Sequence, residues 1–100
     1  MSADELESLI EESLPKLSGL KAVVRFDLGG DGQYMVDARS GRAALITDDD
    51  TDSDCTIKVS AENLAKLMAG KMDPMLAYAM GRIKVSGKMG VAMALVGAIG

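Results

Sequence analysis

The chain has 100 residues; 48% are apolar and only 3% are aromatic, so the apolar content is aliphatic. This length supports one hydrophobic core, and we expect a single domain over residues 1–100. The formal net charge of −4 argues against nucleic acid as a partner, because phosphate contacts need clustered Lys and Arg.

Sequence features also indicate the compartment. The N-terminus is acidic and lacks the basic stretch followed by apolar residues that is typical of a signal peptide. No window reaches the length of uninterrupted apolar residues that a membrane span needs. A lone cysteine, Cys55, excludes an internal disulfide framework and is typical of a reducing environment. We therefore expect a cytoplasmic protein.

The N-terminal segment predicts an amphipathic helix over residues 2–17, with apolar residues at a spacing of three to four. Ser2 and Glu5 have the spacing of a capping box. Pro15 is expected to kink or end the regular helix near residues 13–14, because proline lacks the backbone N–H of a helix interior.

Alternating apolar and polar residues predict strands near residues 24–28, 34–39, 42–47, 55–60 and 83–86. Glycine-rich turns separate the first three, which indicates an antiparallel meander. Because one side of each strand is polar, we expect one sheet face in solvent and helices on the other. The predicted fold class is α+β, with a five-stranded, mixed but mostly antiparallel sheet.

Two further helices are predicted between the fourth and fifth strands. Ser60 is a natural N-cap for the first, which Gly70 ends. Asp73 followed by Pro74 begins the second, which runs to about Met80. Helical connections favour a right-handed parallel crossover if these two strands are neighbours.

The segment 89–100 contains no charged residue and has no polar face at helical spacing. A helix that is apolar all round needs burial on every side. Core packing, a bound lipid, a second subunit and a membrane surface all remain open as its cover. Gly90, Ala94 and Ala98 form a small-residue stripe that fits close packing as well as it fits a ligand.

Methionine is concentrated in the last third of the chain, which holds six of the eight. Methionine is flexible and polarizable, so it suits an adaptable apolar cavity as well as an irregular core. We favour cavity lining for these residues: Met68, Met72, Met75, Met80, Met89 and Met93.

Catalytic and metal chemistry find little support. The chain has no histidine, which removes the commonest general base and most zinc sites. Cys55 alternates in phase with apolar residues, which favours a buried structural thiol. The acidic run 48–54 resembles a calcium loop, but Ser53 and Val59 stand where glycine and glutamate are required. We expect no enzymatic activity, no metal and no cofactor.

The runs Leu67–Pro74, Ala77–Tyr78 and Gly81–Gly90, with Asp54–Ile57 and Val36–Asp37 upstream, resemble the sterol carrier protein type-2 family. The resemblance covers about residues 17–96. It implies helices on one face of a five-stranded sheet and an apolar tunnel between the layers. In that family the tunnel takes fatty acids, acyl-CoA, sterols or phospholipids.

The implied function is lipid binding or transfer, with an aliphatic lipid as ligand and transient contact with a membrane. By this resemblance and the methionine pattern, the expected ligand-binding residues are Met68, Met72, Met75, Leu76, Tyr78, Ala79, Met80, Ile83, Met89, Met93 and Val96. Ala79 stands where many members carry a second aromatic, which implies a differently shaped tunnel. Arg82, Lys84 and Lys88 are interpreted mainly as the solvated face of the fifth strand, and otherwise as head-group contacts.

Two alternatives stay open. The chain could be an interaction module whose apolar tail forms a homodimer, so that both monomer and homodimer remain open. It could also be an accessory domain that presents acyl substrates to a separate enzyme.

Overall fold

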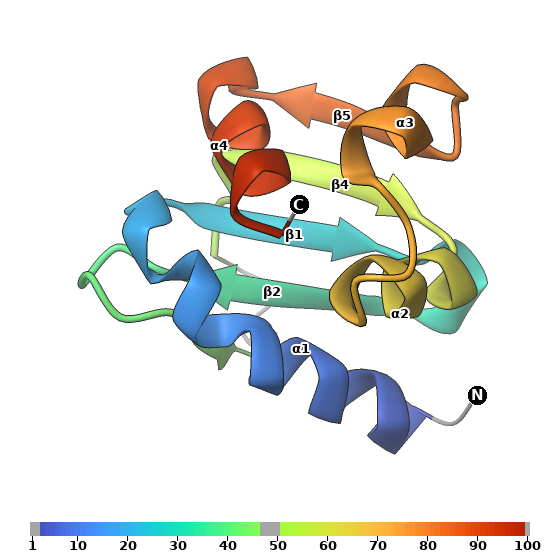
Figure 1. The fold of residues 1–100 in the computed structure, drawn as a ribbon. Coiled ribbons are helices and arrows are strands. Elements are labelled where there is room, and N and C mark those ends of the chain that lie inside the picture. The colour runs from blue at the N-terminus through green and yellow to red at the C-terminus, as the bar shows by residue number, and fades with distance from the viewer. Residues whose placement is uncertain (1–2, 47–50, 100) are drawn as a thin grey trace.

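A computed structural model describes residues 3–46 and 51–99 of the chain. Within these residues lie four α-helices, two 3₁₀ turns and five strands (Figure 1). In chain order they are α1 (Ala3–Leu17), η1 (Ser18–Leu20), β1 (Val23–Asp27), η2 (Gly29–Asp31), β2 (Gln33–Asp37), β3 (Ala44–Ile46), β4 (Cys55–Val59), α2 (Ala61–Met68), α3 (Pro74–Ala79), β5 (Ile83–Gly87) and α4 (Met89–Ile99).

The strands form one mixed sheet in the order β3-β2-β1-β4-β5. Three neighbouring pairs are antiparallel, and β1 and β4 are parallel, with Phe26 opposite Ile57. The expected α+β class and mostly antiparallel sheet are therefore confirmed.

The parallel crossover predicted between β4 and β5 is wrong. These strands are neighbours, but they run antiparallel, with Val59 opposite Ile83. The reason is that the connection contains two short helices separated by a turn at Gly70. One helix carries the chain away from the end of β4, and the other brings it back to the same end (Figure 1).

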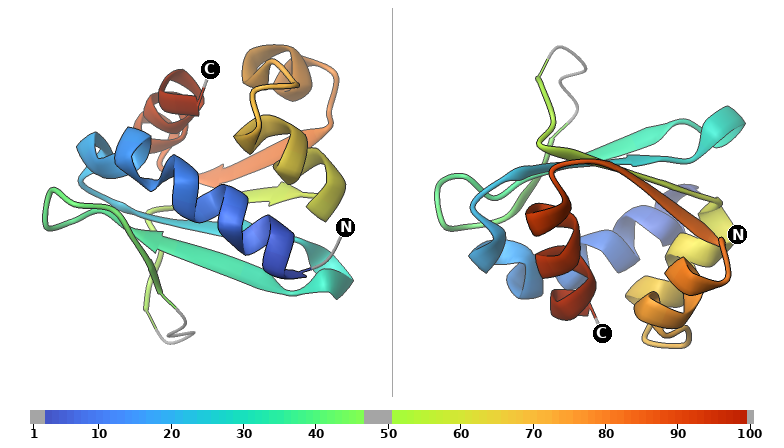
Figure 2. Two further views of the ribbon diagram at one scale, coloured as in Figure 1. Left: turned by 60° about the horizontal axis from the view of Figure 1, so that its bottom comes forward. Right: turned by 90° about the horizontal axis from the view of Figure 1, so that it is seen from above.

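All four helices cover one face of the sheet (Figure 2). Helix α1 packs against α2 and α4, and it buries Leu6, Ile10 and Leu17. Beneath the helices, Phe26 and Val36 from the sheet are almost wholly buried. The apolar spacing of the sequence therefore places one continuous core between helices and sheet.

Pro15 was expected to kink or end the first helix near residues 13–14, and the helix does not end there. Pro15 lies on the exposed side of the last turn, and α1 continues to Leu17, which is fully buried. The fixed φ of proline is compatible with a helix, so near the helix end its main cost is a missing backbone donor. Burial of Leu17 holds the last turn against the core. Ser2, part of the proposed capping box, lies outside the described residues.

The second sheet face is less solvated than the strand pattern predicted. Val23 and Met35 belong to this face by register, yet they are only 1% and 2% exposed. On this side of the sheet, Arg25 donates a hydrogen bond to the carbonyl oxygen of Thr51 at 3.2 Å. The described residues 51–54, just ahead of β4, therefore contact β1 on this face.

Candidate functional site

The predicted ligand residues divide by depth. Met68, Ile83 and Val96 belong to the core, with exposed fractions of 3–6%. Met72 is half-buried. The remaining members are exposed: Met75, Leu76, Tyr78, Ala79, Met80, Met89 and Met93.

Helix α3 presents most of these exposed side chains because it is short and shallow. Asp73 accepts hydrogen bonds from the backbone N–H groups of Met75 and Leu76, at 2.9 and 3.4 Å, so it caps the helix. Gly81 follows the helix with φ of 75°, a left-handed conformation that glycine favours. Only Pro74 and Ala77 of α3 are buried, since they point toward the core.

An open groove of about 470 Å³ lies between α2, α3 and the start of β5. Its apolar lining includes Met72, Leu76 and Met80, three of the residues predicted for ligand binding. The remaining lining residues are Lys66, Lys71, Asp73, Ala77 and Arg82. The structure thus brings part of the predicted set together around one groove.

A second hollow, of about 350 Å³, lies on the other side of the α2–α3 turn. It shares Lys71, Met72 and Asp73 with the groove, and it adds Pro74 and Ile99. Met72 therefore stands between the two hollows. Ile99 belongs to the last turn of α4, so the C-terminal helix meets the candidate site at that end, while neither hollow is lined by Met89 or Met93.

Sequence reasoning did not single out Lys66 and Lys71, two of the polar residues of the groove. It interpreted Arg82 mainly as a solvated strand residue and otherwise as a head-group contact. The signal was available in the spacing: Lys66 and Lys71 flank the end of α2, and Arg82 directly follows the glycine that ends α3. Cations at three element ends around one apolar helix indicate a charged rim.

The sequence-based tunnel between sheet and helices stays a prediction. Both hollows described above open to solvent. In the layer between sheet and helices, Phe26, Leu64 and Leu95 are at most 1% exposed and form part of one core cluster. A ligand that entered this layer would have to displace side chains, which the unbranched methionines do more readily than branched residues.

Cys55 is 1% exposed on the core side of β4. Burial, with a smaller contribution from neighbouring Asp54, raises the pKa of its thiol to about 11. A thiol with so high a pKa is protonated at neutral pH, and the thiolate is the nucleophilic form. The interpretation of Cys55 as a structural thiol agrees with this burial.

The acidic run has a structural role at its described end. Asp54 accepts a hydrogen bond from the backbone N–H of Val23 at 2.8 Å and one from the Lys88 ammonium at 3.1 Å. These two contacts lower the pKa of its carboxyl group. Asp48 and Asp50 lie outside the described residues. Within residues 3–46 and 51–99, no cluster of three or more His, Cys, Asp or Glu side chains could hold a metal ion.

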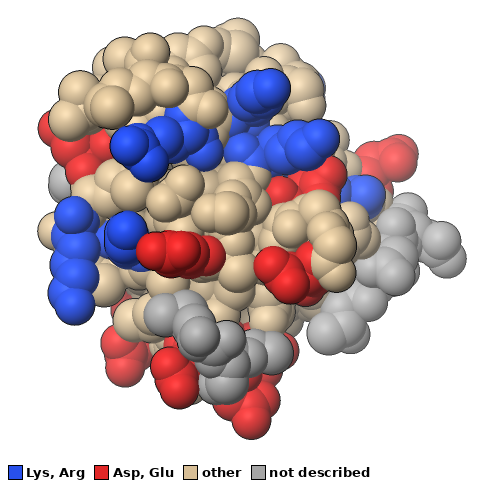
Figure 3. Space-filling view, turned by 90° about the vertical axis from the view of Figure 1, so that its right-hand side faces the viewer, with Lys and Arg blue, Asp and Glu red and all other residues tan. Residues whose placement is uncertain are grey.

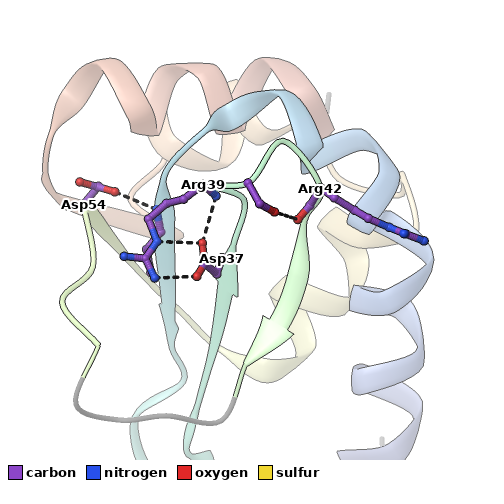
Figure 4. Close-up of polar contacts among 6 residues, drawn as sticks. Asp37, Arg39, Arg42 and Asp54 are labelled. Atoms are coloured by element: carbon purple, nitrogen blue, oxygen red, sulfur yellow. Dashed lines mark hydrogen bonds and ion pairs between the residues drawn. The ribbon is translucent and has the colours of Figure 1, made fainter.

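A third hollow lies at the β2–β3 connection, where Arg39 and Arg42 line it. Figure 4 shows the Arg39 guanidinium folded onto Asp37, with contacts of 2.7 and 3.0 Å. This pairing lowers the pKa of the Asp37 carboxyl group. Because Arg39 is already paired, this exposed hollow is a weaker candidate for a ligand than the groove beside α3.

Comparison with known proteins shows which family the fold belongs to. The profile of the SCP-2 sterol transfer family matches residues 3–100. The chain belongs to this family. Sterol carrier protein 2 of Rattus norvegicus is 38% identical over 93 residues, which cover 91% of this chain and 17% of that relative. The chain therefore spans about a sixth of the length of the curated SCP-2 relatives it matches.

Solved SCP-2 structures share the fold. Palmitated SCP2L2 from Aedes aegypti superposes with a TM-score of 0.72 at 21% identity, covering 99% of this chain and 95% of that one. The sterol carrier protein domain 2 of Helicoverpa armigera gives a TM-score of 0.68 at 24% identity, covering 93% of this chain and 77% of that one. In the part of this SCP-2 chain that the structure describes, no helix has both the length and the apolar character needed to cross a membrane.

Proposed function

We propose that this SCP-2 chain binds the aliphatic part of a lipid beside α3 and transfers it, without catalysing a reaction. The ligand classes are those of the family resemblance: a fatty acid, an acyl-CoA, a sterol or a phospholipid. One observation carries the proposal. Leu76 and Met80 are 57% and 58% exposed on the wall of a groove of about 470 Å³, in a chain of the SCP-2 family.

The physical argument concerns exposed apolar area. Burying a large aliphatic side chain contributes roughly 1.5–3 kcal/mol relative to leaving it in water. Two such side chains on one groove wall thus favour an apolar occupant. The groove volume also lies within the roughly 300–1,000 Å³ of small-molecule sites.

The proposed contacts begin at Met72, Leu76 and Met80, which line the groove. Met68, Ile83 and Val96 are the buried members of the predicted set, and we assign them to the deeper wall that an entering chain would meet. Met75, Tyr78 and Ala79 lie on other sides of the same helix. We place Met89 and Met93, on α4, outside the groove contacts.

Native mass spectrometry of the purified protein, followed by solvent extraction, would identify a bound lipid. Titration with a fluorescent fatty acid gives its affinity. Replacing Leu76 and Met80 with glutamine should weaken binding by about tenfold or more, since the groove wall loses apolar contact. Met89→Gln is the matched control for an exposed methionine. Wild-type protein that binds no fatty acid, sterol or phospholipid would contradict the proposal.

A second candidate function rests on the relatives. The chain covers 22% of hydroxysteroid dehydrogenase-like protein 2 of Xenopus tropicalis, to which it is 28% identical over 93 residues. Similar domains therefore occur within longer proteins, which supports a role in presenting acyl substrates to a separate enzyme. A rise in the kcat/KM of a purified dehydrogenase or thiolase when this chain is added would favour that role.

The homodimer remains the other alternative. Gly90 and Ala94 of the small-residue stripe are exposed on α4, whereas Ala98 packs against the core, so only the first two are left for contact with a second copy. Light scattering across a concentration series, with and without fatty acid, distinguishes a dimerising module from a monomeric lipid carrier. We retain the cytoplasm as the proposed compartment, since the single cysteine is buried and unpaired.

A further inference from the structure

The exposed apolar side chains of α3 cover more than the groove wall. Met75 and Tyr78 are 51% and 41% exposed, and neither lines the groove. With Leu76 and Met80 they leave α3 surrounded by apolar side chains except where Pro74 and Ala77 meet the core. The six-residue helix α3 exposes three large apolar side chains, and Met80 directly after it exposes a fourth, which costs hydration free energy unless something covers them.

Positive charge is also concentrated in the part of the chain that contains α3. Residues 63–100 carry five Lys or Arg residues and one acidic residue, Asp73. Residues 1–62 carry six Lys or Arg residues and fourteen Asp or Glu residues. Asp73 is occupied as the cap of α3. The segment that contains α3 therefore has a net charge of +4 in a protein whose net charge is −4.

The structure brings cations to both ends of α3. Lys71 precedes its cap and Arg82 follows Gly81, and both side chains are exposed. Lys66 also lines the groove, where it is ion-paired with Glu62 at 3.3 Å, so Lys71 and Arg82 are the cations that the surface presents. Figure 3 shows an uncharged upper surface, at the level of α3 and β5 in Figure 1, with Lys and Arg side chains directly below it. Most Asp and Glu side chains in that view lie lower.

We propose that α3, with Lys71 and Arg82 at its ends, is a docking surface for an anionic lipid membrane. Apolar side chains enter the interface between head groups and acyl chains, and cations above them contact lipid phosphates and carboxylates. The net negative charge of the protein selects the orientation, because an anionic membrane repels the acidic helix α1 and attracts only the α3 side.

A second copy of the chain fits this surface less well. A twofold interface centred on α3 would place the same patch on both copies. Lys71 and Arg82 of one copy would then approach the same cations of the other, which opposes association. Anionic head groups instead supply the complementary charge. Docking on a membrane does not require a ligand in the groove. An experiment can therefore contradict the docking proposal and leave the lipid-binding proposal standing, or the reverse.

The test is co-sedimentation with vesicles of phosphatidylcholine alone and of phosphatidylcholine mixed with phosphatidylserine. The wild-type protein should bind the mixed vesicles, and binding should fall as salt rises. Lys71→Gln combined with Arg82→Gln should weaken binding by about 25-fold, since each cation near an anionic surface contributes about fivefold. Lys16→Gln combined with Arg42→Gln changes the net charge equally, outside α3, and should leave binding unchanged.

A methionine pair tests the apolar part. Met75→Gln should weaken vesicle binding several-fold, while Met89→Gln, the same change at a side chain of similar exposure on α4, should not. Fatty-acid titration without vesicles reports the groove separately. Equal binding to both vesicle types, or equal loss in the two cation variants, would overturn the proposal. So would self-association that Met75→Gln abolishes in a protein that binds no vesicles.

Discussion

The backbone carbonyl oxygen of Asp54 lies 2.6 Å from the position that a Cβ atom on Gly87 would occupy. Gly87 also has φ of 94°, where other residues are strained. Because the obstructing atoms belong to the backbone of the neighbouring strand, no side-chain rotation relieves the clash. This glycine allows β5 to end tightly against the start of β4.

Gly87→Ala should therefore lower the free energy of unfolding by about 2–4 kcal/mol, from backbone strain and overpacking together. Urea denaturation measures it. Gly97→Ala is the control, since no atom lies within 4 Å of the added Cβ. In helix α4 that change should raise stability by about 0.5–1 kcal/mol. A Gly87→Ala variant as stable as the wild type would show that the two strands can separate freely.

Asp54 links three parts of the sheet through Val23 and Lys88. Asp54→Ala removes the acceptor for both donors and should cost about 1–2 kcal/mol at neutral pH, most of it from the backbone contact, because exposed ion pairs contribute little. Asp52→Ala, an exposed change in the same segment, should have a small effect. Equal losses in the two variants would contradict the assigned role.

The difference in unfolding free energy between the wild type and Asp54→Ala should depend on pH, because the pKa of Asp54 is lowered in the folded protein. A carboxyl group with a lower pKa in the folded state stabilises the fold above its unfolded pKa, near 3.8. This contribution disappears as pH falls through the lower, folded-state pKa. Urea denaturation at pH 7 and at decreasing pH below about 4 should show the wild type and Asp54→Ala converging. A gap that stays constant across that range would indicate that the charge of Asp54 is irrelevant.

Cys55 should react slowly with a disulfide reagent in the folded protein. Its thiol is buried and its pKa is raised to about 11, so little thiolate forms at pH 8. The absorbance change on thiol release should be slow in buffer and fast in urea. Rapid reaction in buffer would mean that β4 opens easily.

Ligand binding should raise thermal stability. A lipid present at about 100 times its dissociation constant adds about 2.7 kcal/mol to the free energy of unfolding. Palmitate is a suitable first probe. The shift in unfolding temperature should shrink when Leu76 and Met80 are replaced by glutamine and persist in Met89→Gln. An unchanged shift in the double variant would place the ligand elsewhere.

The elements were predictable because their signals are local. Alternation predicted the start of β4 at Cys55 and its end within one residue of Val59, and the caps Ser60 and Asp73 predicted the starts of α2 and α3. Each signal depends on neighbours within a few residues, which a single sequence displays.

The errors concern relations between distant segments. The direction of β5 depends on how two short helices pack, and the local alternation does not reveal that Met35, on the second sheet face, is buried. In the candidate site, methionine content predicted Met72 and Met80. The sequence marked Lys66 and Arg82 only by their positions near element ends, and the fold shows that both line the same groove. Solvent exposure of α3 was equally invisible, because apolar composition alone does not distinguish a core helix from a surface one.

The parallel pairing of β1 with β4 has a consequence for folding during synthesis. β1 finds its partner β2 after a short turn, but Val23 and Asp54 are 31 residues apart in the chain. Until the ribosome has released β4, one edge of the central strand carries unpaired N–H and C=O groups that another chain could pair with. A nascent chain that stalls before Cys55 therefore keeps this edge of β1 open to pairing with another chain.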